Sequence, residues 1–123
     1  MDKRSENGNI TLTAGGPIAK GEFVKFSAGN VVKCTAATDV AIGVALDGAA
    51  AAGDIVPVAV LGSFTGTVQI KAAGAIAQGA EVTPQGKEQT SSGTTELICG
   101  RALEAAAEAG DMIEIAHAVC HAK

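Results

Sequence analysis

The side chains best suited to metal binding lie near the C-terminal end, in the run His117-x-x-Cys120-His121. Imidazole and thiolate are ligands that zinc prefers, but a zinc site needs three or four of them around the ion, and this run offers at most three. On a β-strand, His117 and His121 would share one face while Cys120 points to the other. We favour the alternative interpretation, a terminal strand with a buried cysteine and solvated histidines.

Two pairs of acidic residues could serve acid–base or metal chemistry: Asp47 with Asp54, and Glu104 with Asp111. The pairs occupy matching positions in two similar stretches of sequence, which indicates a role common to both stretches. An aspartate that follows glycine often accepts hydrogen bonds from nearby backbone N–H groups in a turn. We therefore interpret Asp54 and Asp111 as turn residues rather than as a catalytic pair.

The remaining motifs for catalysis are absent. The segment 62–66 has its serine in the wrong place for a nucleophile elbow, and neither histidine lies in a recognisable triad pattern. The segment 14–17 lacks the lysine and hydroxyl residue of a phosphate-binding loop. The sequence therefore predicts no catalytic residue, no cofactor and no metal, and we expect a protein that is not an enzyme.

Composition excludes further classes of function. Of the 123 residues, 47% are hydrophobic but only 2% are aromatic, so there are few ring faces on which sugars or bases could stack. The net charge of −4 argues against binding to a phosphate backbone. The longest apolar stretch, 40–62, is interrupted by Asp47, Asp54 and Pro57 and predicts no membrane partner. Three widely spaced cysteines and an opening without an apolar leader lead us to expect reduced thiols and synthesis in a cytoplasm.

The sequence also resembles itself. Residues 10–24 align with residues 68–82 at an offset of 58, and residues 43–58 align with residues 100–115 at an offset of 57. We predict two structural repeats, 10–62 and 66–119, within a single domain that spans residues 10–123. Residues 1–9 are polar and without periodicity, and we expect a flexible N-terminal arm.

Short apolar alternations predict the strands of this domain at 10–13, 23–26, 42–46, 55–61, 68–71, 97–103 and 112–115. Turns are predicted at 28–30 and 84–86. The alanine-rich stretches 48–52 and 105–109 would support at most one helical turn each. The predicted fold is mainly β, with two pseudo-symmetric β-rich repeats in a compact barrel or a β-clip or β-tulip-like arrangement with short helical turns.

Glycine and aspartate mark the bends of both repeats. Glycine adopts positive φ without steric cost, and the aspartates that follow two of the glycines suit the start of a strand. The residues that we expect to form structural turns are Gly16, Gly21, Gly53, Asp54, Gly74, Gly79, Gly110 and Asp111.

Three segments in this order and spacing carry a resemblance to a known family. They are Ala14-Gly-Gly-Pro-Ile-Ala-Lys-Gly-Glu-Phe-Val-Lys25, Val32-Lys-Cys-Thr-Ala-Ala-Thr-Asp-Val-Ala-Ile-Gly-Val-Ala-Leu-Asp47 and Ala52-Gly-Asp-Ile-Val56. The second copy continues the pattern from Gly74-Ala-Ile-Ala-Gln-Gly79 through Ala109-Gly-Asp-Met-Ile-Glu-Ile115. Between Ile10 and Val119 the chain resembles the capsid cement or head decoration proteins of tailed bacteriophages. The His117–His121 tail departs from the pattern expected of that family.

The resemblance implies a small β-rich homotrimer in the virion, on the outer surface of the capsid, where it binds and bridges the major capsid protein. It implies no catalytic residue. We expect residues 1–9, disordered in the free protein, to become ordered on the capsid by adding a strand to an edge of the capsid protein. The candidate contact residues are Asn9, Ile10, Thr11, Leu12 and Thr13.

An alternative function stays open from the sequence. The pattern A-G-x-x-I-x-x-G also resembles β-clip modules of the SAF type, which would make the chain a ligand-binding or accessory domain of an enzyme or assembly factor. Such a domain should have a pocket with convergent polar groups and a perturbed titrating residue. A cement protein should instead show a flat, self-complementary trimer face and should bind expanded capsids.

Overall fold

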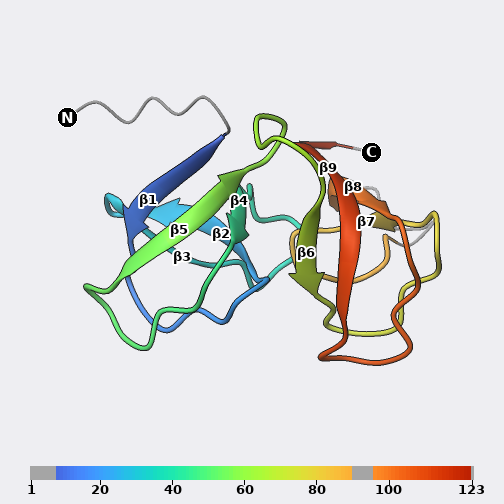
Figure 1. The fold of residues 1–123 in the computed structure, drawn as a ribbon, viewed down its shortest axis with the longest axis horizontal. Helices are drawn as coiled ribbons and strands as arrows, with labels where there is room; N and C mark the ends of the chain where they lie inside the picture. The colour runs from blue at the N-terminus through green and yellow to red at the C-terminus, as the bar shows by residue number, and fades with distance from the viewer. Residues whose placement is uncertain (1–7, 90–95, 123) are drawn as a thin grey trace.

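The computed structural model describes residues 8–89 and 96–122, which form nine strands in two antiparallel sheets (Figure 1). The described residues include no helix, and so none that is long and apolar enough to cross a membrane. The strands are β1 (Asn9–Thr13), β2 (Phe23–Ser27), β3 (Asn30–Lys33), β4 (Gly43–Ala45), β5 (Ile55–Val60), β6 (Val68–Lys71), β7 (Glu81–Val82), β8 (Leu97–Ala102) and β9 (Met112–Ala122). The mainly-β prediction is confirmed.

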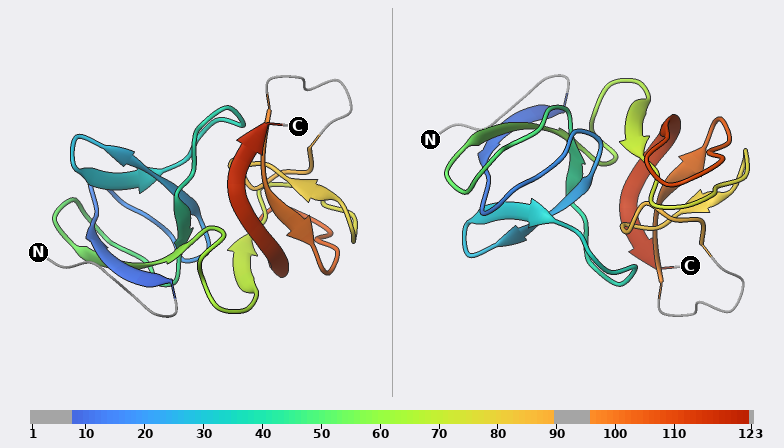
Figure 2. Two further views of the ribbon diagram at one scale, coloured as in Figure 1. Left: turned by 90° about the horizontal axis from the view of Figure 1, so that it is seen from above. Right: turned by 90° about the horizontal axis from the view of Figure 1, so that it is seen from below.

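Each sheet forms one lobe of the molecule, as the two end views show (Figure 2). The first lobe has the strand order β1-β5-β4-β2-β3, and the second has the order β6-β9-β8-β7. Strands that are 57 or 58 residues apart in the sequence therefore have the same neighbours in both lobes. In the part of the second lobe that the structure describes, the counterpart of the β2–β3 pair is the bridge between Val82 and Glu88.

The backbone hydrogen bonds of the two lobes also match. In the first lobe, the Gly21 N–H donates to the Ala45 carbonyl at 2.8 Å. In the second lobe, the Gly79 N–H donates to the Ala102 carbonyl at 2.8 Å. The two lobes thus follow the same path through their turns as well as through their strands.

The two lobes share part of one hydrophobic core. The first lobe has its own cluster, which includes Leu12, Val24 and Val56. A second cluster combines the core of the second lobe with residues from the first lobe, among them Phe23 and Val44. Because burial of apolar surface is the main favourable contribution to folding, this common cluster holds the two lobes against each other.

The short helical turns expected at 48–52 and 105–109 are not formed, so that prediction is wrong. Ala49 instead pairs with Ile18, and Ala106 pairs with Ile76, each through two backbone hydrogen bonds of 2.8 and 2.9 Å. A lone helical turn fixes about three residues for one hydrogen bond, whereas each bridge forms two hydrogen bonds and buries its alanine. Pairing with the rest of the lobe therefore outweighs the helix propensity of alanine.

The N-terminal strand begins at Asn9, and the Gly8 carbonyl already accepts a hydrogen bond from the Val60 N–H at 2.8 Å. The last two residues of the expected arm are thus part of the sheet. Residues 1–7 lie outside the described residues.

Candidate functional site at the open edge of the first lobe

The five candidate contact residues form β1, which is the outermost strand of the first sheet. Thr11 lies opposite Pro57 in the β1–β5 pair, and the Pro57 carbonyl accepts from the Leu46 N–H on the other side, at 2.9 Å. Antiparallel strands alternate between hydrogen-bonded and non-hydrogen-bonded pairs, so the N–H and C=O of Thr11 point away from the sheet. Among the residues that the structure describes, no strand pairs with the outward backbone groups of Thr11, so β1 offers an edge here of the kind that can pair with another strand.

The side chains of β1 hold this edge in place. Leu12 is buried and Ile10 half-buried against the core of the first lobe, while Asn9 and Thr11 are exposed. A slip of one residue would turn Leu12 to solvent, so the register of the edge is strongly specified. Beyond Thr13 the chain turns towards β3, because the Gly15 N–H donates to the Val31 carbonyl at 2.7 Å. The open portion of the edge therefore centres on Thr11.

The predicted turn glycines fall into two groups. Gly21, Gly53, Gly79 and Gly110 have φ values of 87°, 93°, 86° and 97°, in the left-handed region that favours glycine. Gly16 and Gly74 also lie in bends, but their φ values are outside that region, and a Cβ at either position would meet nothing within 4 Å. The backbone conformation therefore requires glycine only at the four positions of the first group.

The carboxylates of Asp54 and Asp111 each accept two backbone hydrogen bonds within their own turns. The donors are the N–H groups of Ala50 and Ala51 for Asp54, at 3.0 and 3.1 Å, and of Ala107 and Glu108 for Asp111, at 2.9 and 3.2 Å. The two aspartates are equivalent in their lobes, and each closes the loop that leads into a long strand. The geometry of both is that of a turn residue.

The C-terminal histidines have different environments on β9. His117 Nδ1 accepts from the Gly62 N–H at 3.0 Å, and Nε2 lies 3.1 Å from the Phe64 carbonyl and 2.9 Å from the Gly66 carbonyl. Because an N–H can only donate, Nδ1 must be unprotonated and Nε2 carries the proton. His117 therefore fixes the linker between the lobes, and the expectation that both histidines are solvated is wrong for it. His121 is exposed.

The three cysteines lie against the shared core at the junction of the lobes, and all are free thiols. Burial, reinforced by nearby Asp39, raises the pKa of Cys34 to about 12. Burial also raises the pKa of Cys99, with Cys120 as a further cause. Both thiols are thus neutral and poor nucleophiles at physiological pH. In the described parts of the chain, no three His, Cys, Asp or Glu side chains are placed to hold a metal ion.

Asp39 is a residue of the junction that the sequence reasoning missed. Its carboxylate accepts from Lys25 Nζ at 2.9 Å and from the N–H groups of Thr35 and Ala36 at 2.9 and 3.0 Å. The loop it organises reaches the second lobe, where the Leu97 N–H donates to the Ala37 carbonyl at 2.9 Å. Aspartate readily accepts backbone hydrogen bonds in turns, and its presence in the segment 35–39 is a signal that could have identified this loop.

We expect acidification to loosen this loop. The hydrogen bond from Lys25 is the largest cause that lowers the pKa of Asp39, and the backbone N–H groups of Thr35 and Ala36 add to it against a smaller opposing effect of burial. A carboxyl group with a lowered pKa stabilises the fold above its unfolded pKa of about 3.9, and this stabilisation is lost as the pH falls through the lower folded value.

Denaturant unfolding of the wild type and of Asp39→Asn as a function of pH tests this expectation. The wild type should be the more stable protein between pH 5 and pH 7, and the difference should shrink below about pH 4. A difference that stays constant down to pH 2 would contradict the assignment.

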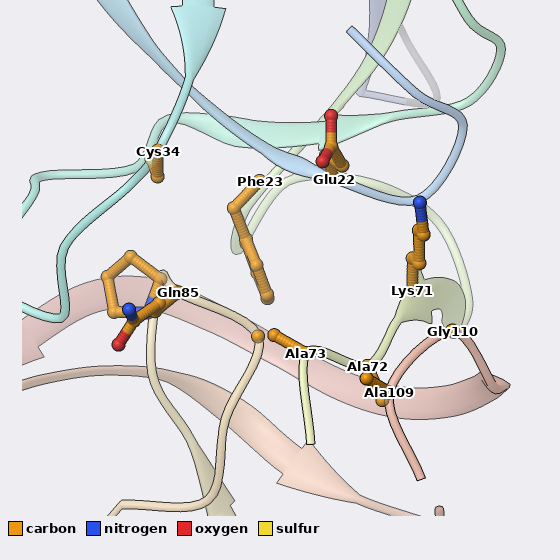
Figure 3. Close-up of a pocket in the computed structure, with 11 residues that line it drawn as sticks. Glu22, Phe23, Cys34, Lys71, Ala72, Ala73, Gln85, Ala109 and Gly110 are labelled. Atoms are coloured by element: carbon orange, nitrogen blue, oxygen red, sulfur yellow. The ribbon is translucent and has the colours of Figure 1, made fainter.

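A cavity of about 320 Å³ opens at the junction of the lobes (Figure 3). Figure 3 shows Phe23 among the residues that line this cavity, between Gln85 on one side and Glu22 and Lys71 on the other. Glu22 Oε1 accepts a hydrogen bond from the Ala19 N–H at 2.8 Å. The polar groups are thus spread around a phenyl ring, unlike the convergent polar groups that a dedicated ligand site presents.

This architecture is similar to that of a known phage protein, and the sequence matches a known family. No curated protein matches the chain. The crystal structure of the N base of head fiber gp8.5 in bacteriophage phi29 matches with a TM-score of 0.65 and 18% identity, over 94% of this chain and 97% of that one, and so has the same fold. The family model described as phage cement protein matches residues 3–117. Since that match spans nearly the whole sequence and its strands, this chain belongs to the phage cement protein family.

Proposed function

We propose that this protein is a capsid decoration protein that binds the outer surface of the phage head as a homotrimer and stabilises the lattice of the major capsid protein. It is made in the host cytoplasm and assembles onto the head. Membership of the phage cement protein family supports a structural role in the phage head. The observation that carries the contact itself is the open edge of β1, with the backbone groups of Thr11 directed outwards.

Strand addition suits a cement protein for physical reasons. An edge strand offers preformed donors and acceptors, so a capsid segment that pairs with it gains main-chain hydrogen bonds with little cost in ordering β1. The side chain of Leu12 is buried in the lobe and holds the strand rigid while the partner binds. A single pairing of this size is weak, but many copies that bind a repeating lattice gain avidity.

The groups that could perform chemistry have structural roles in this proposal. Asp54 and Asp111 close turns, the thiols of Cys34 and Cys99 are neutral, and His117 holds the linker. None of these groups converges with another on a shared cavity in the way that general acid–base catalysis requires. We therefore propose a protein that acts by binding and not by catalysis.

The variant Thr11→Pro tests the contact. Proline removes the outward N–H of Thr11, which has no partner in β5, so the sheet of the free protein should tolerate it. Binding to the capsid edge should fall by roughly tenfold or more, because a hydrogen bond is lost and the ring obstructs the incoming strand. The measurement is the number of copies that co-sediment with undecorated heads across a range of protein concentrations.

Thr11→Val is the matched control, since it changes the same side chain but keeps the backbone N–H. It should bind heads as the wild type does, and both variants should keep the wild-type melting temperature within a few degrees. Unchanged binding by Thr11→Pro would show that the edge of β1 is not the contact.

A further inference from the structure

Within one chain, a turn of the first lobe packs against the edge of the second. The Lys71 N–H, on the outer edge of β6, donates to the Gly21 carbonyl at 2.9 Å. Gly21 is buried there, and a Cβ at this position would collide with the Lys71 backbone and with the Met112 side chain. Leu46, on the same side of the first lobe, packs against the shared core. The contact thus has two halves. One half is the turn at Gly21 with the apolar side chain of Leu46 on the same side of the lobe, and the other is the edge of β6 at Lys71 with the apolar side chain of Met112 next to it.

The matching strands of the two lobes give each of these residues a counterpart. Gly79 corresponds to Gly21, Leu103 to Leu46, Thr13 to Lys71 and Ile55 to Met112. We call Gly79 and Leu103 the plug, and Thr13 and Ile55 the socket. Each lobe therefore carries one used and one unused half of the same contact.

Gly79, Leu103 and Ile55 are exposed in the single chain, and Thr13 is half-buried beside the bridge from Ala14 to Val31. Gly79 is exposed, with nothing within 4 Å of its Cβ position, whereas the equivalent Gly21 is enclosed. Ile55 is 63% exposed and Leu103 is 44% exposed, and they belong to the few large hydrophobic side chains of the described residues that face solvent. Exposed apolar side chains at these two positions are what an unfilled copy of the internal contact would leave.

The two surfaces lie at opposite ends of the molecule. The end of β1 and the start of β5 lie on the far side of the first lobe, and β7 and β8 lie on the far side of the second (Figure 1, Figure 2). The plug of one chain therefore cannot reach its own socket. It can reach the socket of another copy.

We propose that copies of this protein associate head to tail, with the Gly79 turn and Leu103 of one copy seated on Thr13 and Ile55 of the next. Such a contact joins two different surfaces, so it continues until a ring closes. A ring of three copies would fill every plug and every socket, and in this respect the inference deepens the proposed homotrimer and rests on it. Thr13 would receive the neighbouring copy, and Thr11 would remain for the capsid.

The contact between copies is more polar than the internal one. The cross-strand pair Phe23 and Val44 of the first lobe is replaced in the second by Glu81 and Arg101, whose side chains approach to 3.9 Å. Arg101 Nη1 also donates to the Gly79 carbonyl at 2.7 Å. A carbonyl oxygen has two lone pairs, so Gly79 can still accept from a Thr13 N–H. Association should therefore be weak in solution and stronger where a lattice concentrates the copies.

The test uses charge at the two exposed apolar positions. Ile55→Glu and Leu103→Glu each place a carboxylate in one half of the contact, and both side chains are exposed enough that the fold should be retained. Sedimentation equilibrium should show concentration-dependent association of the wild type, weakened at least tenfold in each variant. Phe26→Glu is the control, because Phe26 is 57% exposed but lies on β2, outside the plug and the socket.

Mixing the two variants gives a result that only a head-to-tail contact produces. The Ile55→Glu copy keeps an intact plug and the Leu103→Glu copy keeps an intact socket, so the mixture should form two-copy complexes at concentrations where each variant alone stays monomeric. A mixture that stays monomeric would overturn the proposal, as would equal weakening by Phe26→Glu. A wild type that is monomeric up to on the order of 1 mM would also overturn it.

These outcomes are separate from those of the capsid test. Thr11→Pro should lose head binding and still self-associate, whereas Ile55→Glu should lose self-association while keeping the Thr11 edge. Unchanged head binding by Thr11→Pro would therefore contradict the proposed capsid contact alone. Unchanged self-association of Ile55→Glu would contradict the head-to-tail contact alone.

Discussion

Gly43→Ala should lower the free energy of unfolding by about 3 kcal/mol, although it adds a single methyl group. Gly43 is buried in the middle of the first sheet, on β4 next to β5. A Cβ there would overlap the Ala59 carbonyl oxygen and the Val58 side chain. The carbonyl cannot rotate away, because it belongs to the backbone of a paired strand. The two strands would have to separate locally, and the melting temperature should fall by roughly 10 °C.

The second lobe offers an independent repetition of this experiment. Gly100 on β8 is the counterpart of Gly43, and a Cβ there would lie 2.6 Å from the Ala116 carbonyl oxygen. Gly100→Ala should therefore be destabilising as well. Gly74→Ala is the matched control, since Gly74 has open space around it and should change stability by no more than about 0.5 kcal/mol. Equal melting temperatures for the Gly43 and Gly74 variants would show that the approach of the strands is not the constraint.

His117→Ala should cost about 2 kcal/mol and should act on the linker between the lobes. The substitution leaves the Gly62 N–H without its acceptor and the carbonyls of Phe64 and Gly66 without their donor. A lost hydrogen bond costs about 1 kcal/mol on average, and more where the partner is shielded from water. The tilted contact between the rings of His117 and Phe64, at 6.0 Å between centroids, would be lost as well.

Denaturant unfolding and amide hydrogen exchange measure this effect. Exchange at Gly62 should accelerate more than exchange in the strand interiors, because its N–H is the donor to Nδ1. His121→Ala is the control, since His121 is exposed and its Nδ1 lies 2.8 Å from the carbonyl oxygen of Val119 on its own strand. If His121→Ala proved as destabilising as His117→Ala, the linker would not be the cause.

The strands could be predicted from the sequence because their signals are local. Alternating side chains at 10–13 and 68–71 mark strands with one buried face, and both segments are strands in the structure. The repeated order of small residues also placed equivalent bends in both lobes. The alternation of apolar side chains and the residue types at the turns are local signals, and they were sufficient to predict the fold class.

The remaining features depend on contacts between distant segments. β3 was not predicted, because its strand character comes from the hairpin with β2. The role of His117 was missed because its three partners lie more than fifty residues away in the linker. Gly43 and Gly100 recur in the repeats, but only the neighbouring strand reveals why a side chain is excluded. The candidate edge at β1 could be named from sequence, whereas its free backbone groups follow from the register with β5.

The positions of the two ends and of two turns determine where foreign sequence could be displayed on this protein. The start of β1 and the end of β9 lie on the same side of the molecule, and the segments that join β4 to β5 and β8 to β9 lie on the other (Figure 1). Both turns have unoccupied space around their glycine, Gly53 or Gly110, and exposed tips of this kind accept inserted sequence well. Sequence inserted in the turn between β8 and β9 would therefore project from the side opposite both ends, whereas sequence inserted in the turn between β4 and β5 would lie next to Ile55 and should weaken the head-to-tail contact.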